Sequence, residues 1–348
     1  MRLTYVDTAK FLAIYFVIVS HLCMNSGLSN FLFAFHVPLF FILYGFVFQK
    51  AKASTVKEYV CGGGKKLVYR VLVPYILLSF ILGNAFSLKG LVFITYGSIQ
   101  SINGVTSTHL WFLPCYFLAV WLFNVLKILT LKAKWILPLT VFLMLLFSAS
   151  FDSSKDCMIP LGAYSIHFTG NGVTTGKNFY MGFPLAFNVA FTAIVFIYLG
   201  TYIRSFLMLI EKRRFMQLVV TILSLCLGII AYFANKGNNQ LLAMSYAQYG
   251  TYIYFLTGAL SLSVFVILVS RLVDNRCFAK YGKYTLPIYA FHLALIFVPD
   301  FLFKILHVDM SALPEIKGVV YGTIVLAVSC LLIPLIRKID SNLIGEHK

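Results

Sequence analysis

Residues 215–234 read FMQLVVTILSLCLGIIAYFA, an uninterrupted run without a charged side chain. Lys212, Arg213 and Arg214 precede the run directly, and Lys236 follows it. A helix that crosses a bilayer needs about 20 mostly apolar residues, so the run predicts a membrane-spanning helix between two charged ends. Similar runs recur along the chain and predict ten spans, near residues 9–26, 30–49, 71–88, 109–127, 134–151, 183–203, 215–234, 246–270, 285–303 and 316–336.

The composition of the 348-residue chain supports these spans, because 60% of the residues are apolar and only 11% are charged. Average soluble domains carry about 25% charged residues. The composition therefore excludes a soluble globule, a disordered chain and a secreted disulfide scaffold. The expected fold class is all-α, a polytopic membrane protein with about ten transmembrane helices. We expect 1–348 to form a single transmembrane domain, with no appended soluble domain and no cleavable signal peptide.

The net charge of +17 would suggest a nucleic-acid partner for a soluble protein. In a membrane protein it marks cytoplasmic loops and contacts with anionic membrane lipids, and we expect no nucleic acid. Alternating the ten spans puts most of the 28 Lys and Arg residues on the side of the N-terminus. The positive-inside rule then predicts that both termini are cytoplasmic. The opposite side holds Lys89, Lys155, Lys177, Lys236, Lys304 and Lys317.

Three ionisable residues align in the first predicted span. Lys10 and His21 lie within about 20° of each other around a helix, and Asp7 lies within about 60° of both. Asp7 and Lys10, at i and i+3, can also pair with each other. His21 would lie about 16 Å along the axis from Lys10, well inside the membrane. Ionisable side chains are costly there, so the alignment indicates a functional site as readily as a satisfied polar core.

Two other histidines and one basic segment are further candidates. His36 precedes Pro38 at the start of the second span, where a polar helix start is the alternative interpretation. His292 lies about two turns into the ninth span, after Tyr289, without an interfacial explanation. Residues 62–66, GGGKK, lack the spacing of a phosphate-binding loop, so we expect a flexible basic loop that holds a phosphorylated ligand at most electrostatically. The seven cysteines show no metal-ligand spacing, and we expect no metal.

These residues stand in motifs that together resemble the acyltransferase 3 family of integral membrane acyltransferases. Arg2-x4-Asp7-x2-Lys10-x10-His21 is similar to the family's opening motif, in which a basic residue precedes a histidine. The family branch that the chain resembles is the one related to fucose 4-O-acetylase. The other matching segments are Phe35-His36-Val37-Pro38-Leu39-Phe40-Phe41-x3-Gly45, Arg70-Val71-Leu72-Val73-Pro74-Tyr75, Leu110-Trp111-Phe112-Leu113 and Gly282-Lys283-x2-Leu286-x-Ile288-Tyr289-x2-His292.

The resemblance implies an O-acetyltransferase of the bacterial plasma membrane. It would transfer acetyl from acetyl-CoA to a hydroxyl of a cell-surface glycan or of its lipid-linked precursor. His21 would be the general base or a transient acyl carrier, Asp7 and Lys10 would organise the inner end of the same helix face, and His36 would form a second polar wall. The residues implied for binding are Lys65, Lys66 and Arg70 for the donor phosphates, and Trp111, Tyr289 and His292 for the substrate.

Two departures from the family pattern limit what is carried over. Tyr44 precedes Gly45 where the family often has serine, and Leu67 stands where many members have a second arginine, so neither role is assigned. Two other functions stay open: a transporter or flippase of glycans or lipid-linked sugars, and an assembly subunit of a polysaccharide complex. Consumption of acyl-CoA discriminates, because a transporter would leave the thioester intact.

Overall fold

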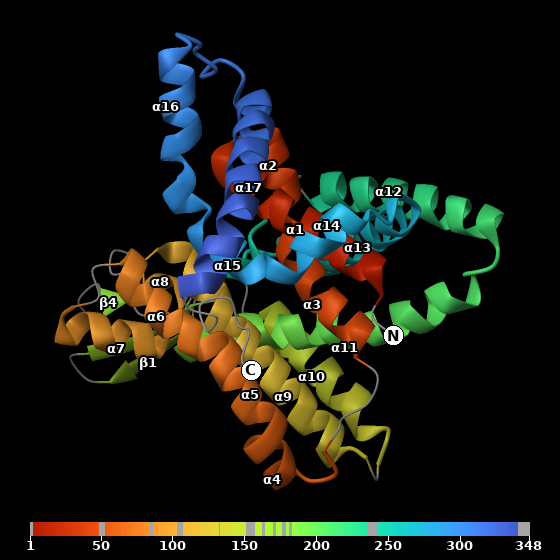
Figure 1. Ribbon diagram of the computed structural model, residues 1–348. Helices are drawn as coiled ribbons and strands as arrows, with labels where there is room; N and C mark the ends of the chain where they lie inside the picture. The colour runs from red at the N-terminus through yellow and green to blue at the C-terminus, as the bar shows by residue number, and fades with distance from the viewer. Residues whose placement is uncertain are drawn as a thin grey trace. The chain divides into compact units, whose positions relative to one another are not determined.

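The computed structural model describes residues 3–48, 53–83, 86–102, 107–131, 133–150, 157–161, 164–169, 172–175, 179–180, 183–235 and 242–339. Helices dominate these residues, from α1 near the N-terminus to α17 near the C-terminus (Figure 1). Contacts divide the chain into two compact units. Unit 1 comprises Met1–Leu43, Ile203–Leu242 and Gly250–Ile344, and unit 2 comprises Tyr44–Tyr202, Ala243–Tyr249 and Gly345–Lys348. Arg2, which opens the first motif, lies outside the described residues.

The helices that contribute to unit 1 include those next to His21, His36 and His292. They are α1 (Thr4–Leu22), α2 (Gly27–Phe33), the first part of α3 (His36–Val47), the last part of α11 (Phe187–Leu209), α12 (Arg214–Asn235), α13 (Tyr252–Val273), α14 (Arg276–Tyr281), η7 (Gly282–Tyr284), α15 (Thr285–Phe291), η8 (Leu293–Leu295), α16 (Phe297–Ile305) and α17 (Pro314–Ile339).

Unit 2 holds the remaining helices, including the rest of α3 and of α11. They are α4 (Val56–Tyr59), η1 (Val60–Gly64), α5 (Lys65–Leu67), η2 (Val68–Leu72), α6 (Val73–Leu82), α7 (Leu88–Tyr96), α8 (Ile99–Ile102), η3 (Thr108–Trp111), α9 (Phe112–Leu129), α10 (Ile136–Ser150), η4 (Pro184–Ala186) and η6 (Met244–Tyr246).

Seven helical segments among the described residues are long and apolar enough to cross a membrane. They coincide with the first, second, fourth, sixth, seventh, eighth and tenth predicted spans, which confirms a helical, multi-pass membrane protein. The ninth predicted span is a bent pair of helices, Arg276–Phe291 and Leu293–Ile305, that meet at 72°. The apolar helix within the fifth predicted span, Ile136–Ala149, is shorter than a span, and α6 ends already at Leu82. The count of ten therefore stays a prediction.

The long polar connection after α10 contains a small antiparallel sheet. Its strands are β1 (Cys157–Leu161), β2 (Tyr164–Thr169), β3 (Gly172–Thr175) and β4 (Phe179–Tyr180), paired in that order. Each strand pairs with the next one along the chain, as short connections between antiparallel strands allow. The sheet adds to the all-α architecture a feature that the apolar pattern did not predict.

The expected flexible loop at residues 62–66 is wrong, because this segment is helical from Val56 to Leu82. Ser54 and Thr55 begin the run: the Glu58 amide donates to Thr55 Oγ1, while the Glu58 carboxylate accepts from the Ser54 amide and hydroxyl. This reciprocal capping stabilises a helix start and compensates for the low helix propensity of three glycines. Gly64 also packs closely, since a Cβ there would lie 3.3 Å from Trp121 Nε1.

The helix α1 is held in unit 1 by close contacts with glycines at both of its ends. A Cβ on Gly282 would lie 1.8 Å from the Asp7 carbonyl oxygen, so only glycine allows η7 to approach α1 there. Gly318 of α17 packs against Cys23 just beyond the other end of α1, where a Cβ would lie 2.6 Å from the cysteine Cβ. These contacts leave α1 little freedom to shift along its axis.

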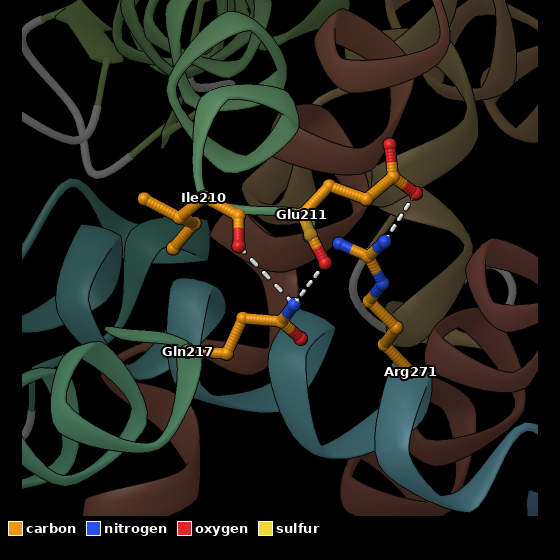
Figure 2. A network of polar contacts seen from close by, with 4 residues as sticks. All are labelled: Ile210, Glu211, Gln217 and Arg271. Atoms are coloured by element: carbon orange, nitrogen blue, oxygen red, sulfur yellow. Dashed lines mark hydrogen bonds and ion pairs between the residues drawn. The ribbon is translucent and has the colours of Figure 1, made fainter. Parts of the chain in front are cut away.

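Contacts inside unit 1 bring together segments that the alternation of the predicted spans puts on the same side of the membrane. Figure 2 shows Arg271, at the end of α13, paired with Glu211 in the turn between α11 and α12. The Gln217 side chain donates to carbonyls of the same turn, including that of Ile210 at 3.2 Å (Figure 2). The Arg271 guanidinium also lies 5.7 Å from the centre of the Tyr5 ring. These segments were all expected on the cytoplasmic side, and that assignment stays a prediction.

Unit 2 packs around α9 with buried polar side chains. The Asn124 amide donates to the Tyr44 hydroxyl at 2.8 Å, and the Tyr44 ring meets that of Tyr116 at 6.1 Å. The neighbouring Gly45 permits close contact with α11, because a Cβ would lie 1.9 Å from the Ile197 carbonyl oxygen. The tyrosine that replaces the family's serine therefore belongs to a hydrogen-bonded pair in the interior of unit 2.

Candidate functional site

His21 lies near the end of α1 and contacts two rings that come from other elements. Its ring centre is 5.4 Å from that of His292 and 5.5 Å from that of Phe33. Phe33 in turn lies 5.0 Å from His36. We refer to His21, Phe33, His36 and His292 as the histidine cluster. The structure thus brings His292 together, within unit 1, with two histidines that lie far from it in the sequence.

His292 stands at the point where the ninth predicted span bends by 72°. It is fully buried, and its Nδ1 lies 2.6 Å from the Tyr289 carbonyl oxygen. A carbonyl oxygen only accepts, so Nδ1 carries the hydrogen and Nε2 carries the lone pair of the neutral ring. The main chain of α15 therefore sets the tautomer and the orientation of this imidazole.

His36 is held in the same manner at the break between α2 and α3. Its Nδ1 donates to the Leu32 carbonyl oxygen at 2.7 Å, and its exposed fraction is only 1%. Unlike His36 and His292, His21 is only partly buried. His21 is consequently the most exposed of the three imidazoles in the cluster.

The predicted pair of Asp7 and Lys10 is present at the other end of α1. Lys10 Nζ lies 3.4 Å from Asp7 Oδ1, and the side-chain exposures are 31% and 4%, respectively. The helical rise separates Lys10 from His21 by about 16 Å, so this pair does not touch the histidine cluster. Any influence of the pair on His21 is exerted along α1 rather than through contact.

The other candidates differ in where the structure puts them. Tyr289 is buried in unit 1, with its ring 6.0 Å from that of His292. Lys65, Lys66 and Arg70 are exposed on the helical run of unit 2. Trp111 is 6% exposed, in η3 of the same unit. The three cations thus form an accessible basic surface, while Trp111 is part of an interior.

Sequence reasoning missed Phe33, the ring that lies between His21 and His36. Its one local signal is its position three residues before His36, which would put both on one side of a continuous helix. The real chain breaks between them, because α2 ends at Phe33 and α3 begins at His36. Spacing alone could not have shown that Phe33 faces α1.

Chemically, the cluster offers three imidazoles in an aromatic setting. An imidazole can take a proton from a hydroxyl or attack an activated acyl group, and both steps need a lone pair on a ring nitrogen. His21 has the access, and the buried His292 beside it has a tautomer fixed by the main chain. The arrangement suits proton transfer at a partly buried site.

Comparison with known proteins finds one matching family. Residues 3–337 match the family model described as an acyltransferase domain. The match extends over both units and includes every candidate residue discussed above. No curated protein matches the chain significantly.

Proposed function

The chain belongs to the acyltransferase 3 family, and from this membership we propose that it transfers acetyl from acetyl-CoA to a hydroxyl of a cell-surface glycan or of its lipid-linked precursor. That it is a multi-pass membrane acyltransferase follows from the family and the apolar helices. The acetyl donor, the glycan acceptor and a bacterial plasma membrane are our proposal. We also propose that residues 1–348 form one functional domain and that both termini lie in the cytoplasm.

His21 acts as the general base in this proposal. It takes the proton of the acceptor hydroxyl while the hydroxyl oxygen attacks the thioester carbonyl carbon. The carbon–sulfur bond then breaks, and the thiolate of coenzyme A takes the proton back from the imidazolium. The ester and the free thiol are the products. In the covalent alternative, His21 itself carries the acetyl group between donor and acceptor.

The neighbouring residues support these steps. His292, whose ring is fixed by the Tyr289 carbonyl, positions His21, and His36 forms the second polar wall across Phe33. Asp7 and Lys10 order the inner end of α1. Tyr289, whose ring lies 6.0 Å from that of His292, is assigned to substrate binding, and Trp111 of unit 2 keeps the same role from the family resemblance alone.

The donor is bound through its charge. Coenzyme A carries several phosphate charges, and Lys65, Lys66 and Arg70 expose three cations within six consecutive positions of a helical run. A rigid helical surface presents them at defined spacing, which suits phosphate contacts better than a mobile loop. A cytosolic donor would reach this surface from the side on which the N-terminus is predicted.

The observation that supports this function most directly is the contrast in burial among the three histidines of one cluster. Only His21 combines partial exposure with a fixed, buried imidazole beside it. A satisfied core histidine would be buried like the other two. The family match supplies the reaction class, and this contrast supports our choice of His21.

The test uses purified protein with acetyl-CoA labelled in the acetyl group and methyl glycosides of hexoses and 6-deoxyhexoses as acceptors. Thiol release and labelled glycoside are measured together. We expect His21→Ala to lower both by about 10²–10⁴-fold, the usual contribution of a positioned general base. The control is His307→Asn, at an exposed loop histidine with a φ of 53° that asparagine tolerates.

Two outcomes would contradict the proposal in different ways. Full activity of the His21 variant would remove His21 from the mechanism. An intact thioester with wild-type protein and every acceptor would oppose acetyl transfer and favour transport of a glycan or a lipid-linked sugar.

A further inference from the structure

A carboxylate lies in the second half of the bent span. The chain turns by 72° at His292, and α16 (Phe297–Ile305) then carries Asp300 in its first turn. Asp300 is exposed among residues that are mostly apolar. An acidic side chain is costly within a membrane-spanning segment, so its presence there calls for a specific partner.

The helix α17 faces this carboxylate with an aromatic and basic surface. Asp300 lies close enough to the Tyr321 hydroxyl to act on it electrostatically. The Tyr321 ring meets that of Phe303 at 5.1 Å, and Lys317 Nζ lies 5.0 Å from the centre of the Tyr321 ring. A carboxylate, a phenol, an ammonium and two rings therefore gather between α16 and α17.

This group of residues lies on elements that are joined directly to the histidine cluster. The helix α16 begins shortly after His292, whose ring contacts His21. On α17, a Cβ on Gly322 would lie 2.8 Å from Val19 Cγ2, and Gly318 meets Cys23. Residues near 320 of α17 are thus level with His21 along α1, and Tyr321 is one of them.

We propose that Asp300, Phe303, Lys317 and Tyr321 form a subsite that binds a sugar ring of the acceptor beside the histidine cluster. This inference rests on the proposed function, in which a glycan hydroxyl is acetylated. Vicinal hydroxyls donate to the Asp300 carboxylate, Lys317 donates to a remaining sugar oxygen, and the apolar face of the ring lies against Phe303. The Tyr321 side chain is only 5% exposed, and its hydroxyl holds the Asp300 carboxylate in place from behind. A few convergent polar groups beside aromatic rings are typical of small-molecule sites.

The alternative is that the same contacts only hold α16 against α17. Packing would depend on the rings and would change little when the charge of one exposed carboxylate is removed. Recognition would depend on the carboxylate itself, because a bound hydroxyl that loses a charged acceptor loses a strong hydrogen bond. Asp300→Asn keeps the size and removes the charge, so it separates the two explanations.

The experiment measures binding of methyl glycosides to the detergent-solubilised full chain by saturation-transfer NMR, without acetyl-CoA. Wild-type protein should saturate the ring protons of at least one glycoside. We expect Asp300→Asn to weaken that binding about 10- to 100-fold and Tyr321→Phe to weaken it by a smaller factor. The matched control is Asp274→Asn, an exposed carboxylate just after α13 with a φ of 22°, a backbone conformation that asparagine tolerates.

Four results would decide whether the subsite exists. Equal binding by wild type and Asp300→Asn, or no glycoside bound by the wild type, would overturn the subsite. Equal weakening by the Asp274 control would overturn it as well, because the effect would then follow net charge. Binding that depends on Asp300, combined with an intact thioester in the transfer assay, would uphold the subsite and refute acetyl transfer.

Discussion

Replacement of Gly282 by alanine tests the packing that fixes α1. The new Cβ would lie 1.8 Å from the Asp7 carbonyl oxygen and 2.7 Å from its carbon, whereas ordinary contact begins at 3.4 Å. The two segments must therefore separate by about 1.6 Å. Because both sides of the contact are backbone, no rotamer change relieves it. Overpacking usually costs about 1–3 kcal/mol, and we expect Gly282→Ala to cost about 3 kcal/mol or more.

The measurement is the temperature at which half of the detergent-solubilised protein stays monodisperse in gel filtration after heating. A loss of about 3 kcal/mol should lower this temperature by several degrees. The control is Gly258→Ala on α13, where the nearest atom would lie 3.6 Å away and alanine gains about 0.5–1 kcal/mol of helix propensity. A Gly282 variant as stable as the wild type would show that η7 does not approach Asp7 in this way.

Two further predictions concern charged contacts at the ends of helices. Lys10→Met should lower the free energy of unfolding by about 1–2 kcal/mol, because Asp7 stays buried while its partly exposed partner is lost. A double-mutant cycle with Asp7→Asn, measured by the same heating assay, should show that the two substitutions are coupled. Additive effects of the two substitutions would contradict the ion pair. Hydrogen bonds from Ser54 and Thr55 lower the pKa of Glu58, so its ionised form stabilises the start of the run at Val56. That stabilisation is present above the ordinary glutamate pKa of about 4.3 and is lost as the pH falls through the lower folded-state pKa. Hydrogen exchange of residues 56–67 should therefore speed up on acidification beyond its intrinsic pH dependence in wild type but not in Glu58→Gln, and equal behaviour would refute the cap.

Much of the membrane architecture could be predicted from the sequence, because a bilayer imposes a simple length rule on apolar runs. Runs such as 215–234 became single long helices for this reason. The bend at His292 could not be predicted, since residues 285–303 are apolar on both sides of it. The helix through Gly62, Gly63 and Gly64 was missed because glycine content outweighed the capping residues Thr55 and Glu58 in our interpretation.

The contacts of the candidate site also divide into those that the sequence could predict and those that it could not. The i, i+3 spacing was enough to predict the contact of Asp7 with Lys10, because a single helix fixes it. The contact of His21 with His292 joins residues 271 positions apart and depends on how α15 packs against α1, which no local pattern encodes. Family resemblance brought both histidines into consideration, and packing made them neighbours. The tyrosine at position 44 acquired a partner, Asn124, that the motif did not indicate.

The glycine contacts at the two ends of α1 fix the position of this helix along its axis. His21 lies fourteen positions after Asp7, the residue beside Gly282, which corresponds to about 21 Å of helix. Because α1 is held at both ends, it cannot move the His21 imidazole toward a donor bound at the cytoplasmic surface. Under the proposed function, the distance must be covered by the donor, whose thin flexible arm can extend into the protein while its phosphates stay outside. The length of that arm would then determine the depth in the membrane at which the acetyl group is transferred.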